Sequence, residues 1–540
     1  MLIKEFLEES AQKFPQKIAL IAGNSAWRYE QLNRAANVLA RQLVDNRFNP
    51  GDRAVLLTEN SIEMVIAIFA VLKVGGAFVP LHSSTKTNQL IYLINNCQAK
   101  VLFVSTASSS DLQDVRLKAP MLEKIWLMGA AKDTTLSLPT QSRPSTEVAG
   151  TDKVDGFLCL RNPEVGIESV FREREETKPI SPAPAGIPPA DLATLIYTSG
   201  STGHPKGVTL TNHNWVTAIK GIVRYLENTH EDVILNALPL SSSYGLTQIF
   251  TAFYVGATVL LEKAFTAPYA ILNRAAQQGV TGFAGVPTMF ALLQKLDRPS
   301  FSFPTLRYVT NAGAALPVPF IAKLQQWFPN ARIYLMYGLT ECIRVSYLPP
   351  EEIARRPTSV GKPMPGIQAF VVDEEGNSLP PHHIGELVVR GENVTPMYWG
   401  EPQRSAQFIR SGATQQERIL HTNDLFKVDE EGFLYWVARR DELIKVKGFL
   451  ISPYEIENVL YQLAGIAEVK VVGLPDKTSG EIIKALIVLE PEATLTPRQI
   501  AEHVSRYLED YKVPQMIEFV PTLSKTHTGK IIISKGSKTV

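Results

Sequence analysis

The first 125 residues alternate between segments of helical periodicity and short apolar runs, and this alternation most constrains the fold. Phe6, Ala11 and Phe14 mark a first amphipathic helix. The run Ile18-Ala19-Leu20-Ile21 that follows is typical of a buried strand, and the alternation continues through residue 81. Because parallel strands need helical crossovers, the pattern predicts an α/β fold with a largely parallel sheet.

The length of 540 residues predicts more than one domain, because single cores rarely grow that large. Residues of about 130–190 are rich in proline, which is excluded from helix interiors and central strands, so we interpret them as a connector between two α/β halves. Alternating strand patterns over about 366–437 predict a small β subdomain. We expect a large N-terminal domain over 1–438, made of two α/β subdomains and this β subdomain, and a small α+β C-terminal domain over 439–540.

Charge and cysteine content exclude several classes of protein. The formal net charge is +1, so no global field attracts nucleic acid or an anionic membrane. The three scattered cysteines, Cys97, Cys159 and Cys342, fit neither a disulfide framework nor a zinc site. The apolar stretch Met64–Leu72 is too short to span a bilayer, and the N-terminus does not resemble a signal peptide. We therefore predict a cytoplasmic protein without nucleic-acid or membrane partners.

One polar loop carries the strongest chemical signal. The apolar run at Leu195 stops at a series of hydroxyls and glycines, and Lys206 follows before a helical pattern resumes near Trp215. Converging backbone N–H groups, hydroxyl donors and a lysine suit a polyphosphate. The loop is not a Walker A motif, because no Gly-Lys-Ser/Thr ends the required spacing. A Ser/Gly-rich surface turn is the structural alternative.

Five motifs in order make the chain resemble the adenylate-forming (AMP-binding) ligases, which include acyl-CoA synthetases, stand-alone adenylation enzymes and luciferases. Each motif alone is weak evidence, but the ordered set covers nearly the whole chain. The motifs are the loop Tyr197–Lys206, the segment Tyr337–Glu341, the segment His421–Leu425, the hinge-like Arg439–Phe449 and the terminal Thr526–Lys530.

The resemblance implies a two-step reaction. A carboxylate attacks the α-phosphate of ATP, which gives an acyl-adenylate and pyrophosphate. A thiol, either of CoA or of a carrier protein's phosphopantetheine, then displaces AMP. Because charge concentrates on phosphate oxygens, cations and preorganised donors aimed there should dominate catalysis.

For the phosphates, the resemblance implies that Lys206 acts with the loop that precedes it. Glu341 would hold Mg²⁺, since a hard cation prefers carboxylate oxygen, and Thr340 would contact the α-phosphate. The loop residues implied are Thr198, Ser199, Gly200, Ser201, Thr202 and Gly203.

For the nucleoside, the resemblance implies that Tyr337, followed by Gly338, lies on the adenine. Gly313 and Ala314 would line the other face of the ring. Asp424 would accept hydrogen bonds from the ribose hydroxyls, and Arg439 would add a contact.

Lys530 resembles the catalytic lysine that neutralises charge between the carboxylate and the α-phosphate. It lies in the small domain, so the resemblance implies a mobile C-terminal domain that closes and then rotates about Asp441 to admit the thiol.

The substrate acid is less constrained. No acidic residue occurs among Ser241–Gly245, where amino-acid-activating members carry an aspartate for the substrate ammonium, and this favours a plain carboxylic acid. A stand-alone amino-acid adenylation enzyme remains an alternative, and both acceptors stay open. The residues expected in the acyl pocket are Ser243, Tyr244, Thr247, Gly285, Met289, Gly313 and Ile343.

Two further observations bear on the family assignment. Lys206, Glu341, Asp424 and Lys530 are all present, which argues against a second alternative, a non-catalytic nucleotide-binding homologue. Asn423 stands where the family commonly has glycine, and this departure affects detailed geometry only.

Overall fold

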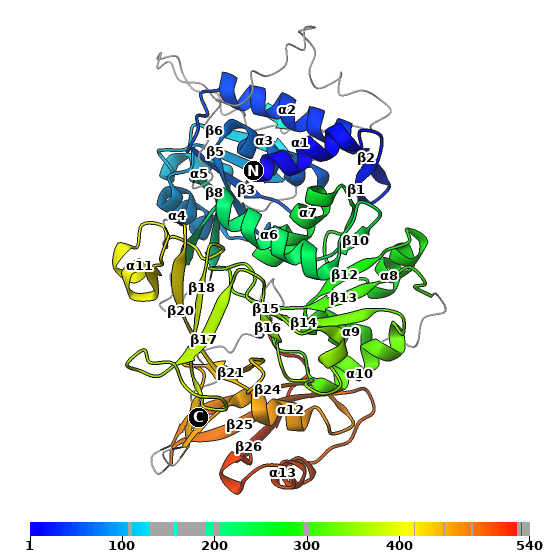
Figure 1. The fold of residues 1–540 in the computed structure, drawn as a ribbon, viewed down its shortest axis with the longest axis vertical. Helices are drawn as coiled ribbons and strands as arrows, with labels where there is room; N and C mark the ends of the chain where they lie inside the picture. Colours follow the sequence, from blue (N-terminus) through cyan, green and yellow to red (C-terminus); the bar gives the residue numbers. More distant parts are fainter. Residues whose placement is uncertain are drawn as a thin grey trace, which may run out of the picture.

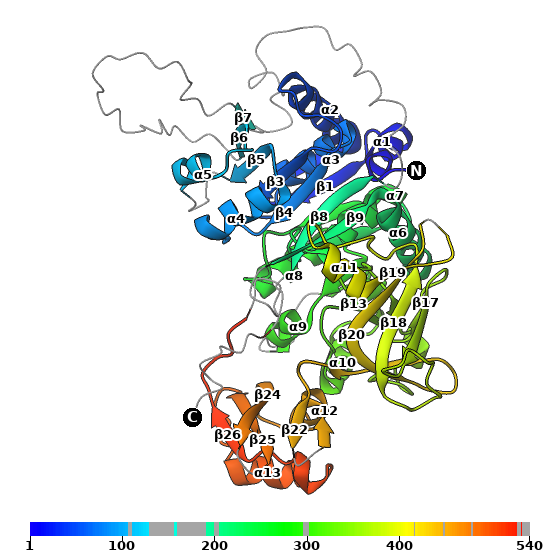
Figure 2. The same cartoon turned by 90° about the vertical axis from the view of Figure 1, so that its left-hand side faces the viewer.

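The computed structural model describes most of the chain, and Figures 1 and 2 show its arrangement in two views. Helices and mainly parallel strands alternate through the large N-terminal part, as the sequence predicts, which confirms the α/β class. The described residues are 1–105, 111–128, 156–158, 191–198, 205–294, 302–414, 416–446, 449–476, 479–525 and 531.

The first sheet has seven strands, all parallel to their neighbours except the last pair. In spatial order they are β7 (Gly156–Leu158), β6 (Lys124–Met128), β5 (Val101–Ser105), β3 (Arg53–Leu57), β4 (Ala77–Leu81), β8 (Leu192–Thr198) and β9 (Lys206–Thr211).

The second sheet has nine strands and is parallel in its centre, with antiparallel pairs at both ends. In spatial order they are β16 (Lys362–Pro363), β15 (Ser346–Tyr347), β14 (Arg332–Tyr337), β13 (Tyr308–Asn311), β12 (Gly282–Gly285), β10 (Val233–Asn236), β11 (Thr258–Leu261), β1 (Ile18–Ala22) and β2 (Ser25–Arg28).

Each of the two sheets contains strands from both sides of the expected connector. The N-terminal hairpin of β1 and β2 joins the second sheet through β11, whereas β8 and β9, which come after the connector, complete the first sheet. Of the stretch at about 130–190, Gly156–Leu158 forms the edge strand β7, and the remaining residues lie outside the described part. Strand partnership is non-local, and proline content carries no information about it.

Side chains alternate across the strands and divide the large domain into five layers of helices and sheets. In β3, Ala54 and Leu56 face a central helical layer, whereas Val55 and Leu57 face an outer one. The central layer comprises α1 (Ile3–Lys13), α2 (Tyr29–Asp45), α3 (Ile62–Val74), α6 (Asn212–Leu226) and α7 (Ser243–Val255). The outer layers comprise α4 (Thr87–Cys97) and α5 (Leu112–Lys118) on the first sheet, and α8 (Pro268–Gln277), α9 (Pro287–Gln294) and α10 (Val318–Trp327) on the second.

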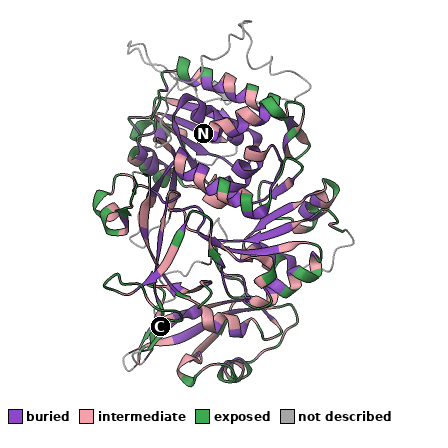
Figure 3. Ribbon diagram, in the orientation of Figure 1, coloured by how far each residue is buried: buried purple, intermediate pink, exposed green. Residues whose placement is uncertain are grey.

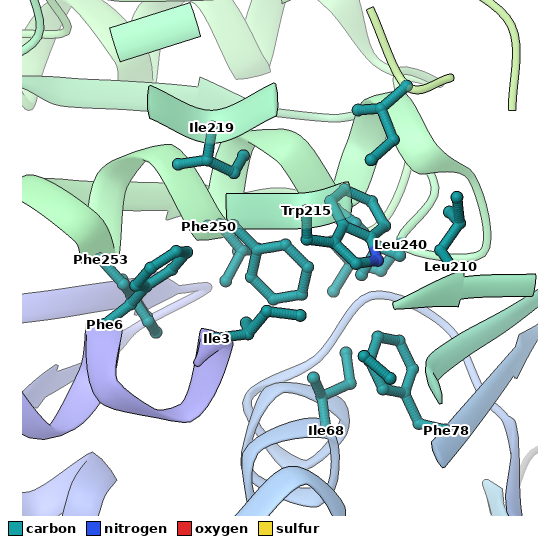
Figure 4. Packing of buried hydrophobic residues seen from close by; sticks show 14 of the residues in the cluster. Ile3, Phe6, Ile68, Phe78, Leu210, Trp215, Ile219, Leu240, Phe250 and Phe253 are labelled. Atoms are coloured by element: carbon teal, nitrogen blue, oxygen red, sulfur yellow. The ribbon is translucent and has the colours of Figure 1, made fainter. Parts of the chain in front are cut away.

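Figure 4 shows how tightly this central layer packs. Trp215 of α6 meets Phe250 of α7 edge to face, with ring centroids 5.0 Å apart. Phe78 of β4 and Ile68 of α3 enclose the same region, and Figure 3 shows the sheets buried under half-exposed helices. The two sheets are thereby held as one scaffold for the loops at their edges.

The β subdomain follows the second sheet and is antiparallel. Its elements are β17 (Gln368–Val372), β18 (Gly385–Gly391), α11 (Pro402–Phe408), β19 (Ile409–Ser411), β20 (Arg418–Val428) and β21 (Leu434–Arg439).

The C-terminal unit lies at the far end of the molecule, where the five strands β22 to β26 form one mixed sheet with a separate hydrophobic core. Its elements are β22 (Ile444–Val446), β23 (Phe449–Ile451), α12 (Pro453–Leu460), β24 (Ile466–Asp476), β25 (Gly480–Leu489), α13 (Pro497–Ser505) and β26 (Met516–Phe519). No helix in the described part of the chain combines the length and hydropathy that a membrane span requires.

Candidate active site

The polar loop connects two antiparallel strands of the first sheet. β8 and β9 pair with Thr198 opposite Lys206, so the hairpin holds Lys206 at the mouth of the loop. The helix α6 follows directly, and its cap Thr211 accepts a hydrogen bond from the backbone N–H of Asn214 at 3.1 Å. The expected order of strand, loop, strand and helix is confirmed. The loop residues Ser199, Gly200, Ser201, Thr202 and Gly203 lie outside the described residues.

The carboxyl ends of the parallel strands β12, β13 and β14 meet at one edge of the second sheet. The segment after β13 turns at Gly313, whose φ of 87° is in the left-handed region that glycine favours. The side-chain amide of Asn311 closes this turn by donating to the carbonyl of Ala314 at 3.0 Å. Gly313 and Ala314 are exposed at this edge, beside the segment after β14 that begins with Tyr337.

The residues expected to hold adenine and ribose are in direct contact. The Tyr337 hydroxyl donates to Oδ2 of Asp424 at 2.6 Å, and the Tyr337 ring meets Phe426 edge to face at 4.8 Å. Asp424 is 3% exposed. Burial and the Asp424 charge raise the pKa of Tyr337 well above its ordinary value, so the phenol stays a donor. The hydrogen bond links the second sheet to the β subdomain.

The departure at Asn423 has a conformational explanation. Its φ is 60°, in the left-handed region, which asparagine tolerates better than most residues other than glycine. Its backbone N–H donates to Oε1 of Glu386 at 2.9 Å, and its carbonyl accepts from the N–H of Arg440 at 3.1 Å. Asn423 therefore preserves the backbone shape that a glycine would allow.

Glu341 is positioned by the β subdomain. The Tyr398 hydroxyl donates to Oε1 of Glu341 at 2.9 Å, and the Thr395 N–H donates to the Glu341 carbonyl at 2.6 Å. The same segment reaches the strand β9, where the Trp399 N–H donates to the Gly207 carbonyl at 2.7 Å. Residues 395–399 thus fix Glu341 relative to the base of the polar loop.

Gly338 has no room for a side chain. A Cβ there would lie 2.6 Å from the carbonyl oxygen of Ile343 and 3.0 Å from Cα of Arg344. The backbone can therefore fold back between Tyr337 and Ile343 only if residue 338 is glycine, and this fold brings Thr340 and Glu341 to the sheet edge.

Cations and carboxylates share one electrostatic environment around Lys206. Burial lowers the pKa of Lys206, and Arg404 and Arg439 lower it further. Glu341 and Glu401 oppose this effect and raise it. The cations come from three separate segments, and such convergence is the electrostatic condition for holding a polyphosphate.

Arg439 lies between two acids. Its Nε is 3.6 Å from Oδ1 of Asp424, its partner across the β20–β21 ladder, and 3.5 Å from Oδ1 of Asp441. Burial lowers the pKa of Arg439, but Asp424 and Asp441 outweigh it, so the net shift is upward. The hinge candidate Asp441 is therefore next to the candidate nucleotide residues.

Three of the residues expected in the acyl pocket, Ser243, Tyr244 and Thr247, lie on α7, and Tyr244 reaches β13 at the sheet edge. The Tyr244 hydroxyl lies 2.7 Å from Oγ1 of Thr310 in β13, and burial raises the pKa of Tyr244 to about 12. Thr247 donates through its hydroxyl to the Tyr244 carbonyl at 2.6 Å. Ser243 begins α7, Gly285 ends β12, Met289 lies on α9 and Ile343 follows β14.

The turn at Ile343 is strained. Its φ is 62°, an uncommon value for a β-branched residue. The side-chain amide of Asn393 clamps the turn by donating to the carbonyls of Cys342 and Arg344, each at 2.7 Å. The two hydrogen bonds from Asn393 hold the backbone in this strained turn next to Ile343, a residue of the candidate acyl pocket.

Comparisons with known proteins identify the family of this chain. A family model described as AMP-binding enzyme matches residues 7–399. The chain belongs to the AMP-binding enzyme family. A second model, AMP-binding enzyme C-terminal domain, matches residues 455–530, a segment that ends at Lys530, which lies outside the described residues. The resemblance to adenylate-forming ligases is therefore confirmed.

Relatives of this AMP-binding enzyme extend over its whole length. The long-chain-fatty-acid–CoA ligase of Escherichia coli O6:H1 is 28% identical, covering 98% of this chain and 92% of the relative. The structure of the anthranilate CoA ligase AuaEII in complex with anthranoyl-AMP is similar with a TM-score of 0.84 and 26% identity, over 98% of this chain and 95% of that one. The o-succinylbenzoate CoA synthetase of Bacillus subtilis, in complex with an acyl-adenylate intermediate, gives a TM-score of 0.79 and 25% identity, over 97% and 96%.

Three residues beside the candidate site of this AMP-binding enzyme lie outside the sequence motifs. Tyr398 holds Glu341, Arg404 acts on Lys206, and Arg344 follows the strained turn. Tyr398 and Trp399 form an aromatic pair in a polar segment, and this pair was the one local signal available. Nothing local marks Arg344 or Arg404, because their roles depend on distant segments.

Proposed function

We propose that this AMP-binding enzyme activates a carboxylic acid as an acyl-adenylate, with release of pyrophosphate, and transfers the acyl group to the thiol of CoA. The contact between Tyr337 and Asp424 carries the proposal, because it joins the expected adenine and ribose residues beside Glu341 and Lys206. The family membership and the CoA ligases among the relatives support the same reaction.

The chain's own groups fit ATP. Asp424 offers carboxylate oxygens to the ribose hydroxyls, and the exposed backbone at Gly313 and Ala314 leaves space beside Tyr337 for a flat base. Lys206, Arg404 and Arg439 supply positive charge for the phosphates, and Thr340 adds a hydroxyl near the α-phosphate. Thr198 and the loop residues up to Gly203 would add N–H and hydroxyl donors to the β- and γ-phosphates.

The donor set around Glu341 fits Mg²⁺. Tyr398 occupies one carboxylate oxygen, which leaves the other for a hard cation that prefers oxygen ligands. When bound there, the ion would neutralise phosphate charge as the acid attacks.

We assign the second domain to residues 439–540, with the hinge at Asp441. Lys530 on this domain would neutralise charge between the carboxylate and the α-phosphate during adenylation, and rotation about Asp441 would then admit the thiol. The contact between Arg439 and Asp441 supports a hinge whose position depends on the nucleotide.

The acceptor test separates CoA from the phosphopantetheine arm of a carrier protein. ATP–pyrophosphate exchange is measured with a panel of acids, and thioester formation is then measured with CoA and with a loaded carrier protein. We expect exchange with at least one acid and thioester with CoA. Absence of exchange with every acid contradicts the ligase function, and transfer to the carrier protein alone contradicts the CoA assignment.

A further inference from the structure

Two arginines are buried in the described part of the chain, and they differ in their surroundings. Arg356 is 6% exposed and contacts three carboxylates, with its Nε 3.0 Å from Oδ2 of Asp429 and its other nitrogens on Glu352 and Glu431. Arg344 is 2% exposed, and no carboxylate of a described residue lies within ion-pair distance of it. Burying a guanidinium without a counter-charge costs folding free energy, so the position of Arg344 needs an explanation.

The neighbours of Arg344 are neutral. Its guanidinium lies 5.1 Å from the ring centroid of Tyr244. The charge of Arg344 also acts on Tyr225, whose pKa it lowers against the larger effect of burial. Burial raises the pKa of both phenols, so neither supplies a negative charge near neutrality. The Nε of Arg344 is buried and has no hydrogen-bond partner. The cation–π contact alone compensates only part of the desolvation.

The backbone fixes where this charge lies. Arg344 directly follows the strained Ile343, and Asn393 holds the Arg344 carbonyl, so the side chain is directed against Tyr244. Tyr244 and Ile343 are both members of the candidate acyl pocket. The unpaired cation therefore lies at the wall of the space into which the acyl group of a substrate would extend.

We propose that Arg344 is a specificity-determining residue that pairs with a second anionic group on the substrate, so that the acid activated is a dicarboxylic acid. This inference rests on the proposed function. One carboxylate is adenylated and the other becomes the counter-ion that Arg344 lacks. The same charge disfavours a substrate ammonium in the pocket, which agrees with the absence of an acid in Ser241–Gly245.

The test compares acids that differ only in the second carboxylate. Exchange is measured with malonate through suberate, each beside the monocarboxylic acid of the same length, and with phthalate beside benzoate. We expect the wild type to prefer a dicarboxylic acid. In Arg344→Met the ratio of kcat/KM for that acid to kcat/KM for its monocarboxylic partner should fall about 100-fold, as expected for loss of a charge-assisted pair. Arg344→Lys should restore part of the ratio.

Arg332→Met is the matched control. Arg332 lies at the start of β14, twelve residues before Arg344. Its guanidinium also lies near a tyrosine ring, 6.0 Å from the Tyr334 centroid. It pairs with Glu227 at the surface, so its substitution should leave the ratio unchanged.

Binding gives a readout independent of turnover. The preferred dicarboxylic acid should raise the Tm of the wild type and not that of Arg344→Met. Equal losses for both acids in Arg344→Met, or a wild-type preference for monocarboxylic or amino acids, overturn the inference while leaving the ligase function intact. Failure of every acid to support exchange counts against the ligase function, and the absence of a Tm shift with every dicarboxylic acid overturns the role of Arg344 as well.

Discussion

The nucleotide side and the acyl side of this site are built from the same sheet edge but differ in how their polar groups are satisfied. On the nucleotide side, Asp424 is hydrogen-bonded by Tyr337 and faces Arg439. On the acyl side, the buried Arg344 faces only neutral phenols. In the first arrangement the two opposite charges lie 3.6 Å apart, whereas in the second no carboxylate of a described residue pairs with Arg344. The two sides therefore differ in whether a charge of opposite sign from the protein lies next to the buried charged group.

The largest effect is expected at Lys530, which tests whether the C-terminal domain contributes to the nucleotide side. Lys530→Ala should lower the adenylation rate about 1,000-fold, because the charge between carboxylate and α-phosphate loses its neutralising cation. Thioester formation from supplied acyl-adenylate should be spared. The two half-reactions are measured separately, by pyrophosphate release and by thioester yield.

Lys525→Ala is the control for this substitution. Lys525 belongs to the same terminal segment and pairs with Glu468 at 2.8 Å. Its loss should leave both half-reactions within about twofold of wild type, as for a partly exposed ion pair. Equal loss of both half-reactions in Lys530→Ala would contradict its assignment.

Removing Asp424 takes away the carboxylate that contacts Tyr337 and Arg439 on the nucleotide side. Asp424→Ala deletes the acceptor of the Tyr337 hydroxyl and the expected ribose ligand, so KM for ATP should rise about 30-fold. Tyr337→Phe removes only the donor, and a rise of about fivefold is expected. Steady-state kinetics at saturating acid measure both.

Glu375→Ala offers a matched control, because Glu375 is an exposed acid of the same subdomain. It should leave KM for ATP unchanged. If Asp424→Ala raised KM for the acid and not for ATP, the division between the two sides would be wrong.

The candidate nucleotide residues could be named from the sequence because they occur in short ordered motifs. The polar loop between Thr198 and Lys206 stands out by its residue types, and the segment from Tyr337 to Glu341 is recognised by its resemblance to the family motif. The acyl side could not be found in this way, since Arg344 is notable only for the carboxylate that is missing from its surroundings. The same limit applies to strand pairing, because β1 joins the second sheet and β8 joins the first.

A substitution at Gly338 tests whether the nucleotide side and the acyl side depend on the same backbone turn. Gly338→Ala places a Cβ 2.6 Å from the Ile343 carbonyl, so the turn that carries both Glu341 and Arg344 must shift. Overpacking of this kind costs about 1–3 kcal/mol, and we expect kcat to fall about tenfold for every acid.

Gly221→Ala provides the contrast for Gly338→Ala. A Cβ at Gly221 in α6 would make an ordinary contact at 3.4 Å with Sδ of Met364, so this substitution should be neutral or stabilising. Thermal unfolding and kcat are measured for both variants. An unchanged kcat in Gly338→Ala would show that activity does not depend on the turn that carries Glu341 and Arg344.

The smallest effect is expected at Asn423, because its contribution to the nucleotide side is the backbone conformation that precedes Asp424. Asn423→Gly should be nearly neutral, because glycine adopts a φ of 60° without cost. Asn423→Ala should destabilise by about 1 kcal/mol and raise KM for ATP about twofold, since Asp424 is the next residue and follows its backbone. Urea unfolding midpoints and KM are compared across the three proteins. Equal stability of the alanine and glycine variants would mean that left-handed geometry at residue 423 contributes nothing, and that the backbone hydrogen bonds with Glu386 and Arg440 hold this turn.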